Sequence, residues 1–230
     1  MQRFEKPREA VIKTFNELDS PNWETIIVGL RSLVRLIRHH PENLDSQMHM
    51  VCIQMTRSVR NLRSQVASAA CQAASQLFSL NSSVMEHECD DLVCALLHPT
   101  ADTNRFLSSD ACKTLDSMCD NLTPSKIINF LVSKGAVHPH AMVRTSETKL
   151  LNRLVERLGY ERVFTLSRDL RDKVFITGAH LLQEGSLDTR SHAKSLFRQL
   201  SEHHNCACLL LEVIPSRVYR NIEKTLKSLR

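Results

Sequence analysis

Five short polar stretches interrupt the chain, and a helical pattern of apolar residues follows each of them. We mark each stretch by one residue, and the markers are Trp23, Arg63, Arg105, Arg144 and Arg190. Successive markers are separated by 40, 42, 39 and 46 residues. Because a fixed period of this length indicates stacked structural units, the pattern predicts a repeat protein.

The residues after the four arginine markers share one register. In every case the seventh and the tenth residue after the marker are apolar: Ala70 and Ala73, Cys112 and Leu115, Leu151 and Leu154, Phe197 and Leu200. This spacing places the two residues on one face of an amphipathic helix. The period is that of HEAT or armadillo units, which are roughly 40 to 47 residues long.

Another helical run precedes each marker, so each unit is predicted to be a pair of helices. The expected first helices cover residues 5–18, 42–58, 84–97, 124–135 and 161–184, and Pro215 divides the tail 205–230 into a last pair. We therefore expect an all-α solenoid of about six HEAT-like helix pairs that forms a single domain over residues 1–230. A unit this short cannot bury its apolar face alone, so stacking would supply the core.

Composition supports the helical prediction. With 5 glycines, 7 prolines, 1 tryptophan and 2 tyrosines in 230 residues, the chain lacks the turn residues and aromatics that a β fold of this size would use. The 8 cysteines include no C-x-x-C pair and are expected to be small core residues in a reducing compartment. The net charge of +5 is a mild bias toward acidic partners.

Stacking in register would display the marked loops along one edge. That edge would be basic and would carry one indole, an arrangement that suits a protein interface because Trp and Arg supply much of the binding energy where they are desolvated. Structural roles are the alternatives. Trp23 could be buried between the first two helices, and each arginine could form a ladder with neighbouring repeats or merely solvate a turn.

The marked segments resemble those of a TOG domain, the six-HEAT-repeat tubulin-binding module. The likeness covers almost the whole chain and is carried by Asn22-Trp23, by Asn61-Leu62-Arg63-Ser64-Gln65-Val66, by Arg105-Phe106-Leu107, by Val143-Arg144 and by Thr189-Arg190 with Ala193 and Lys194. The linker-associated branch and the axonemal branch, also called crescerins, are the most similar. We favour the axonemal branch.

The resemblance implies the functional residues. In TOG domains the loops within the repeats contact tubulin, which would give this role to Trp23, Leu62, Arg63, Arg105, Arg144, Arg190 and Lys194. Two positions depart from the pattern. Ile26 stands where many members have a basic residue, and Asn104 stands where a lysine is common. Both departures bear on affinity rather than fold.

The expected function is binding of α/β-tubulin or the microtubule lattice, and hence regulation of microtubule growth or stability. The alternatives are a scaffold that binds another protein through the same edge and, less favoured, a solenoid that grips nucleic-acid phosphates. We find no catalytic motif, no cofactor motif and no paired metal ligands, so no enzyme activity, cofactor or metal is expected. We also expect a monomer without membrane spans, in the cytoplasm and cytoskeleton, with the ciliary axoneme as one location.

Overall fold

The computed structural model describes residues 2–135 and 137–229. All of the regular structure in these residues is helical. The chain divides into two compact units, Met1–Leu122 and Thr123–Arg230, called unit 1 and unit 2 below. The all-α prediction is confirmed, whereas the expectation of a single domain over residues 1–230 remains a prediction.

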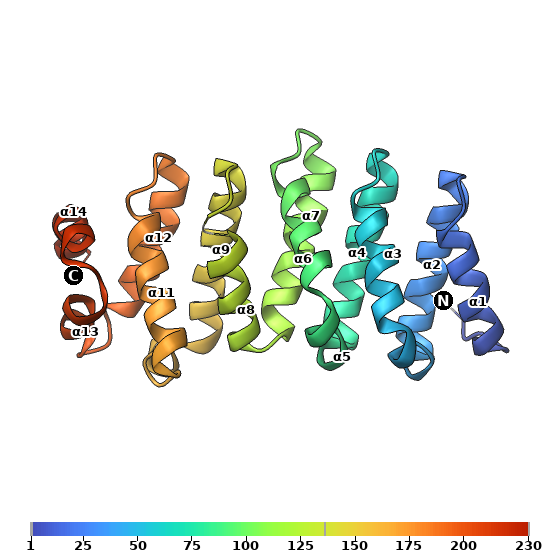
Figure 1. Cartoon of the computed structure of the whole chain (residues 1–230), viewed down its shortest axis with the longest axis horizontal. Helices are drawn as coiled ribbons and strands as arrows, with labels where there is room; N and C mark the ends of the chain where they lie inside the picture. Colours follow the sequence, from blue (N-terminus) through green and yellow to red (C-terminus); the bar gives the residue numbers. More distant parts are fainter. Residues whose placement is uncertain (1, 136, 230) are drawn as a thin grey trace. The chain divides into compact units, whose positions relative to one another are not determined.

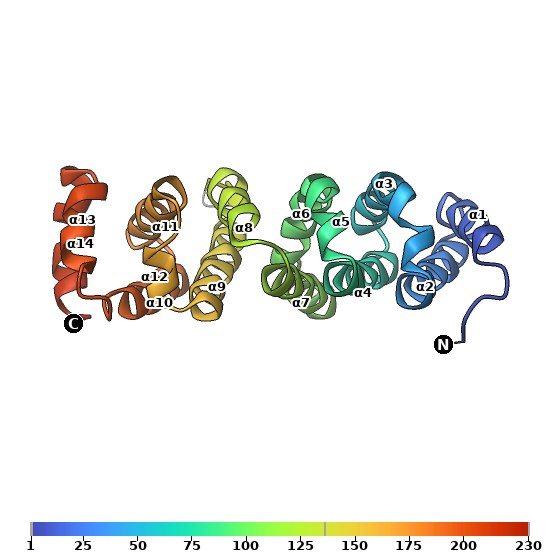
Figure 2. The same cartoon turned by 90° about the horizontal axis from the view of Figure 1, so that it is seen from below.

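Unit 1 contains three helix pairs, α1/α2, α3/α4 and α5–α6/α7 (Figure 1). Its elements are α1 (Pro7–Leu18), α2 (Trp23–His39), the 3-10 turns η1 (Pro41–Asn43) and η2 (Asp45–Gln47), α3 (Met48–Val59), α4 (Ser64–Leu80), α5 (Ser82–Glu88), α6 (Asp90–Leu97), η3 (His98–Ala101) and α7 (Arg105–Asn121). Helices α2, α4 and α7 form one layer, and α1, α3 and α6 form the other (Figure 2). The predicted helix over 84–97 is two helices.

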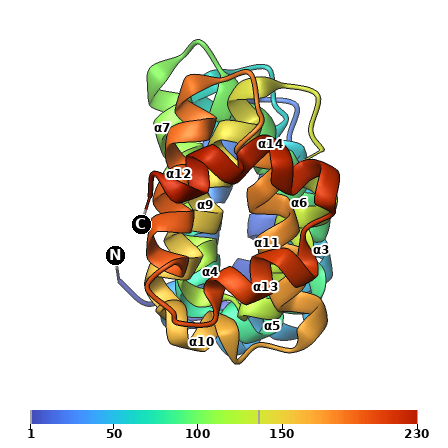
Figure 3. The same ribbon diagram turned by 90° about the vertical axis from the view of Figure 1, so that its left-hand side faces the viewer.

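Unit 2 also contains three pairs, α8/α9, α10–α11/α12 and α13/α14. Its elements are α8 (Pro124–Phe130), the π-helical turn η4 (Leu131–Gly135), α9 (Ala141–Leu158), α10 (Tyr160–Phe164), α11 (Arg168–Leu181), α12 (Leu187–Leu200), α13 (Cys206–Val213) and α14 (Ser216–Lys227). The predicted run 161–184 is divided into α10 and α11. The last pair contacts α11 and α12 and lies across them (Figure 3).

The apolar stripe that defines the repeat forms the core. Of the paired stripe residues, all are buried except Cys112, which is half-buried. Cys52 and Cys71 are buried as predicted, and burial raises the pKa of each thiol to about 12. Cys208 is exposed, contrary to the expectation for the cysteines, because it lies off the buried face of α13, which Cys206, Leu209 and Leu210 form.

Two glycines allow neighbouring helices to approach closely. A Cβ added at Gly29 of α2 would lie 3.0 Å from the backbone nitrogen of Leu18, at the end of α1. A Cβ at Gly178 of α11 would lie 3.0 Å from Leu196 on α12. Larger residues would push these helices apart, so the glycines help to fix the spacing within the first and fifth pairs.

Candidate functional site

The loops inside the three pairs of unit 1 lie at one end of the helices (Figure 1). They comprise residues 19–22, 60–63 and 102–104 and are called loops 1, 2 and 3. The marker residues stand where these loops enter the second helix of each pair. Trp23 and Arg105 are the first residues of α2 and α7, and Arg63 is the N-cap of α4.

Loops 1 and 2 bring two of the predicted site residues together. The guanidinium carbon of Arg63 lies 5.3 Å from the centroid of the Trp23 ring, within the range of a cation–π contact. Trp23 is half-buried, so it is neither sunk in the core nor fully exposed, while Arg63 is exposed. The pair therefore presents an indole face and a guanidinium group on the same surface.

The remaining predicted residues of unit 1 are fully accessible. Leu62 has a relative exposure of 103%, so folding removes none of this side chain from water. Arg105 is exposed, and no ion pair joins it to another described residue. Side chains that folding leaves in water contribute little to the stability of the chain, so a partner protein can cover them without disturbing the fold.

Asparagine side chains hold the backbone of these loops. Oδ1 of Asn22 accepts a hydrogen bond from the Glu24 amide at 2.9 Å, and Oδ1 of Asn61 accepts one from the Arg63 amide at 2.9 Å. Asn104 caps α7 by accepting from the amides of Phe106 and Leu107. This explains one departure from the family pattern, because the residue that replaces lysine at this position is an effective N-cap.

In unit 2, arginine side chains hold the loop backbone in place of asparagines. Nη1 of Arg144 donates to the carbonyl oxygens of His138 and Pro139 at 2.8 and 2.9 Å, both in the loop before α9. Nη2 of Arg144 forms a 3.0 Å ion pair with Glu184, in the loop before α12. With relative side-chain exposures of 19% and 24%, Arg144 and Glu184 are largely shielded from water.

Arg190 repeats this arrangement one helix pair later. Its Nη1 donates to the carbonyl oxygens of Glu184 and Gly185 at 2.6 and 2.8 Å. Arg144 and Arg190 thus bind the carbonyls of the residues six and five positions before them. Glu184 takes part in both arrangements, through its side chain and its backbone. Lys194, one turn further along α12, is exposed.

The position of these two arginines corrects one sequence expectation. Arg144 and Arg190 were expected in polar stretches that precede the helices, but α9 begins at Ala141 and α12 at Leu187. Side-chain caps from His140 and Ser186 start each helix early. Side chains of a helix lean toward its N-terminus, so an arginine at the fourth helical position can fold back over the preceding loop.

The structure adds apolar residues that the sequence analysis did not select. Phe106 is 84% exposed in the first turn of α7, Met142 is 55% exposed in the first turn of α9, and Leu187 is 70% exposed as the first residue of α12. Each stands beside a marked loop. The available signal was an apolar residue in the polar stretch, off the stripe that forms the core.

A buried acid lies one turn after Arg144. Glu147 has a relative exposure of 2%, and neither of its carboxylate oxygens has a hydrogen-bond partner among the described residues. Burial raises the pKa of this carboxyl to about 8, against the opposing effect of the Arg144 guanidinium. Glu147 is therefore largely protonated at neutral pH.

Within residues 2–135 and 137–229, no three His, Cys, Asp or Glu side chains are grouped so that they could hold a metal ion. Among the described helices, none combines the length and the apolar character needed to cross a bilayer.

A known protein is similar to this chain over the whole length of the chain. The chain is 30% identical over 230 residues to TOG array regulator of axonemal microtubules protein 1 of Mus musculus, which covers 100% of this chain and 13% of that relative. The chain thus spans about an eighth of the relative's length. No family model matches the chain.

Solved structures show the same fold. The TOG domain of C. elegans Zyg9 aligns with a TM-score of 0.71 at 14% identity, over 94% of this chain and 81% of that one. A structure described as the basis of tubulin recruitment and assembly by microtubule polymerases with TOG domain arrays aligns with a TM-score of 0.67 at 13% identity, over 93% and 45%. The predicted resemblance is confirmed: the chain has the TOG-domain fold and is similar along its whole length to an axonemal TOG-array regulator.

Proposed function

We propose that this chain is a tubulin-binding module that docks α/β-tubulin or the microtubule lattice through the marked loops. The observation that carries the proposal is the surface formed by Trp23, Arg63 and the fully exposed Leu62. The similarity to an axonemal microtubule regulator supports the identity of the partner. Binding, without catalysis by the chain, would contribute to regulation of microtubule growth or stability.

The side chains divide into two proposed roles. Direct contact with tubulin falls to the half-buried Trp23 and to the exposed residues Leu62, Arg63, Arg105 and Lys194. Arg144 and Arg190 hold the loops before α9 and α12 in place, and they present Met142 and Leu187. That Arg144 and Arg190 themselves touch tubulin stays a prediction.

A protein partner fits this surface better than nucleic acid. Exposed Leu62 and Phe106 stand beside Arg63 and Arg105, whereas phosphate binding relies on basic groups and needs no such apolar residues. We place the module in the cytoskeleton, with the ciliary axoneme as its proposed site, and we propose that it acts as a monomer.

Gel filtration with unpolymerised tubulin and pelleting with microtubules test the proposal together. The wild-type chain should co-elute or co-pellet, and Trp23→Glu combined with Arg63→Ala should weaken binding while circular dichroism stays helical. Arg220→Glu is the matched control, because Arg220 is an exposed arginine on α14, outside the loops. A wild-type chain that binds neither form of tubulin would overturn the proposal.

A further inference from the structure

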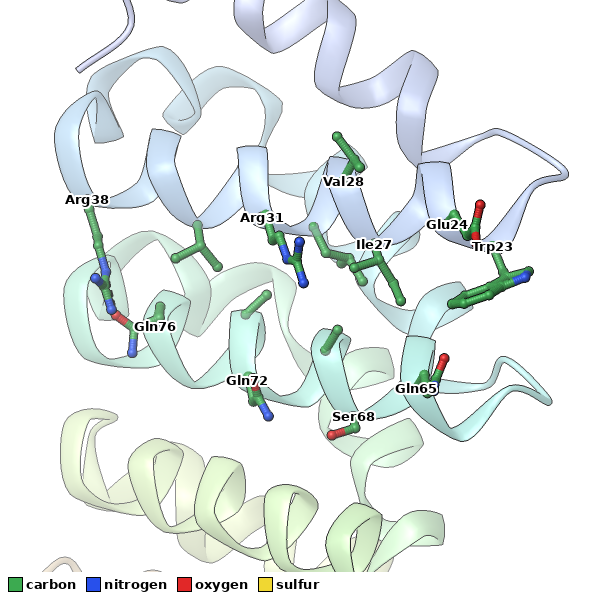
Figure 4. Close-up of a pocket in the computed structure, with 14 residues that line it drawn as sticks. Trp23, Glu24, Ile27, Val28, Arg31, Arg38, Gln65, Ser68, Gln72 and Gln76 are labelled. Carbon is green, nitrogen blue, oxygen red and sulfur yellow. Dashed lines mark hydrogen bonds between the residues drawn. The ribbon is translucent and has the colours of Figure 1, made fainter. Parts of the chain in front are cut away.

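A groove runs between α2 and α4 along the layer of second helices in unit 1 (Figure 4). It begins beside Trp23 and ends where Nε of Arg38 donates to Oε1 of Gln76 at 3.0 Å. These ends are 15 residues apart on α2. At 1.5 Å per residue the groove is about 22 Å long, which matches about seven residues of extended chain.

Small residues on α4 create the groove. Ala69 and Ala73 line its wall where α4 faces α2, together with Ser68. Opposite them, α2 contributes the aliphatic side chains of Ile27 and Val34. Because these three side chains of α4 are no larger than a methyl or hydroxymethyl group, they leave space between the two helices at their positions.

The polar groups of the groove favour an acidic ligand. Arg31 points into the space between the two helices (Figure 4), is exposed and has no carboxylate partner among the described residues. Arg38 supplies a second cation at the far end, and Arg63 stands over the Trp23 ring at the near end. Glu24 is the one acid among the residues that line the groove.

We propose that this groove binds an extended acidic segment of a partner protein, about seven residues long. Carboxylates of the segment pair with Arg31 and Arg38, and alternate side chains of the extended chain lie on the aliphatic wall formed by Ile27 and Val34. Gln72, whose amide nitrogen donates to Asp110 at 2.9 Å, is held in place on the opposite wall. The site runs along the helices, and only its near end, at Trp23 and Arg63, adjoins the loop surface.

Fluorescence anisotropy with a labelled heptapeptide tests the site. The probe alternates four glutamates with three leucines, and a second probe replaces each glutamate by lysine. We expect the acidic probe to bind at least about tenfold more tightly than the basic probe at moderate salt. Arg31→Glu should weaken binding of the acidic probe by about tenfold, and Arg31→Gln by less, because charge reversal adds repulsion.

Arg220→Glu provides the matched control, with the same charge change on an exposed helix of unit 2, and it should change binding less than twofold. Equal binding of the two probes, or equal binding by wild type and Arg31→Glu, would overturn the proposal. A seven-nucleotide DNA strand that binds as tightly as the acidic peptide would overturn the assignment to a protein segment. Tubulin binding through the loops would stand in either case.

Discussion

The loops of the two units use arginine in different ways. In unit 1, Arg63 and Arg105 are exposed, and Asn61 and Asn104 hold the loop backbone. In unit 2, Arg144 holds its own loop with two hydrogen bonds to carbonyl oxygens, as Arg190 does. The same residue type in the same repeat register thus stays exposed in one unit and holds the loop backbone in the other.

The start of the second helix produces this difference. Arg63 is the N-cap of α4, so its side chain lies beyond the helix and is free to cover Trp23. Arg144 and Arg190 are preceded by a full extra turn of helix, which places their guanidinium groups beside the carbonyls of the loop. In both cases the early helix start accompanies the arginine that holds its own loop.

The largest expected effect is a pH dependence of the free energy of unfolding, which arises from unit 2 and has no counterpart at the same position in unit 1. Glu147 of unit 2 occupies the register position that Val66 holds in unit 1, and both are buried. The folded chain keeps the Glu147 proton up to pH of about 8, whereas the unfolded chain releases it near 4.5. The free energy of unfolding should therefore fall as pH rises between these values, by up to about 5 kcal/mol.

Glu147→Gln should remove this pH dependence, because the amide carries no titrating proton. Urea unfolding of both proteins at pH 5 and pH 8.5 measures it, and the difference between them isolates Glu147 from other titrating groups. Parallel stability curves for wild type and variant would show that the carboxyl is not buried in the manner described.

The next effect concerns the two kinds of arginine. Arg144→Ala removes two hydrogen bonds to the loop and leaves Glu184 without its ion-pair partner, so it should lower the free energy of unfolding by about 3 kcal/mol. Arg63→Ala should change it by less than about 0.5 kcal/mol, because Arg63 is exposed. Urea unfolding at pH 7 compares them, and equal losses would abolish the distinction between the units.

Arg190→Ala should have an intermediate effect of about 1.5 kcal/mol. Arg190 donates to two loop carbonyls, as Arg144 does, but lacks an ion pair in the structure. Thermal unfolding followed by circular dichroism measures the loss. A cost as large as that of Arg144→Ala would mean that the Glu184 ion pair adds nothing to stability.

The smallest effect tests how the loops of unit 1 are held. Asn104→Ala removes the N-cap of α7 and should cost about 1 kcal/mol, with Asn104→Ser recovering most of it because serine also caps. Chemical denaturation measures both variants. If serine gave no recovery over alanine, the asparagine would not be acting as a cap.

The sequence predicted the repeat because burial imposes a regular pattern. The stripe that includes Ala70, Leu151 and Phe197 could be read directly, since a residue that faces the core must be apolar. The exact helix starts could not be read, because the caps from His140 and Ser186 compete with equally polar neighbours. The division between exposed and structural arginines depends on those starts.

The groove between α2 and α4 was also not predicted from the sequence. The alanines of α4 fit an ordinary amphipathic helix, and nothing local shows that Ala69 and Ala73 line an unfilled space beside α2. A groove depends on two helices that are about 40 residues apart along the chain.

Hydrogen–deuterium exchange of the chain with and without tubulin tests the central claim most directly, because it reports each loop separately. We predict that tubulin slows exchange of the backbone amides in residues 60–66 and 104–108 of unit 1. Unchanged exchange in both segments under conditions where tubulin is bound, with protection confined to helices away from the loops, would contradict it.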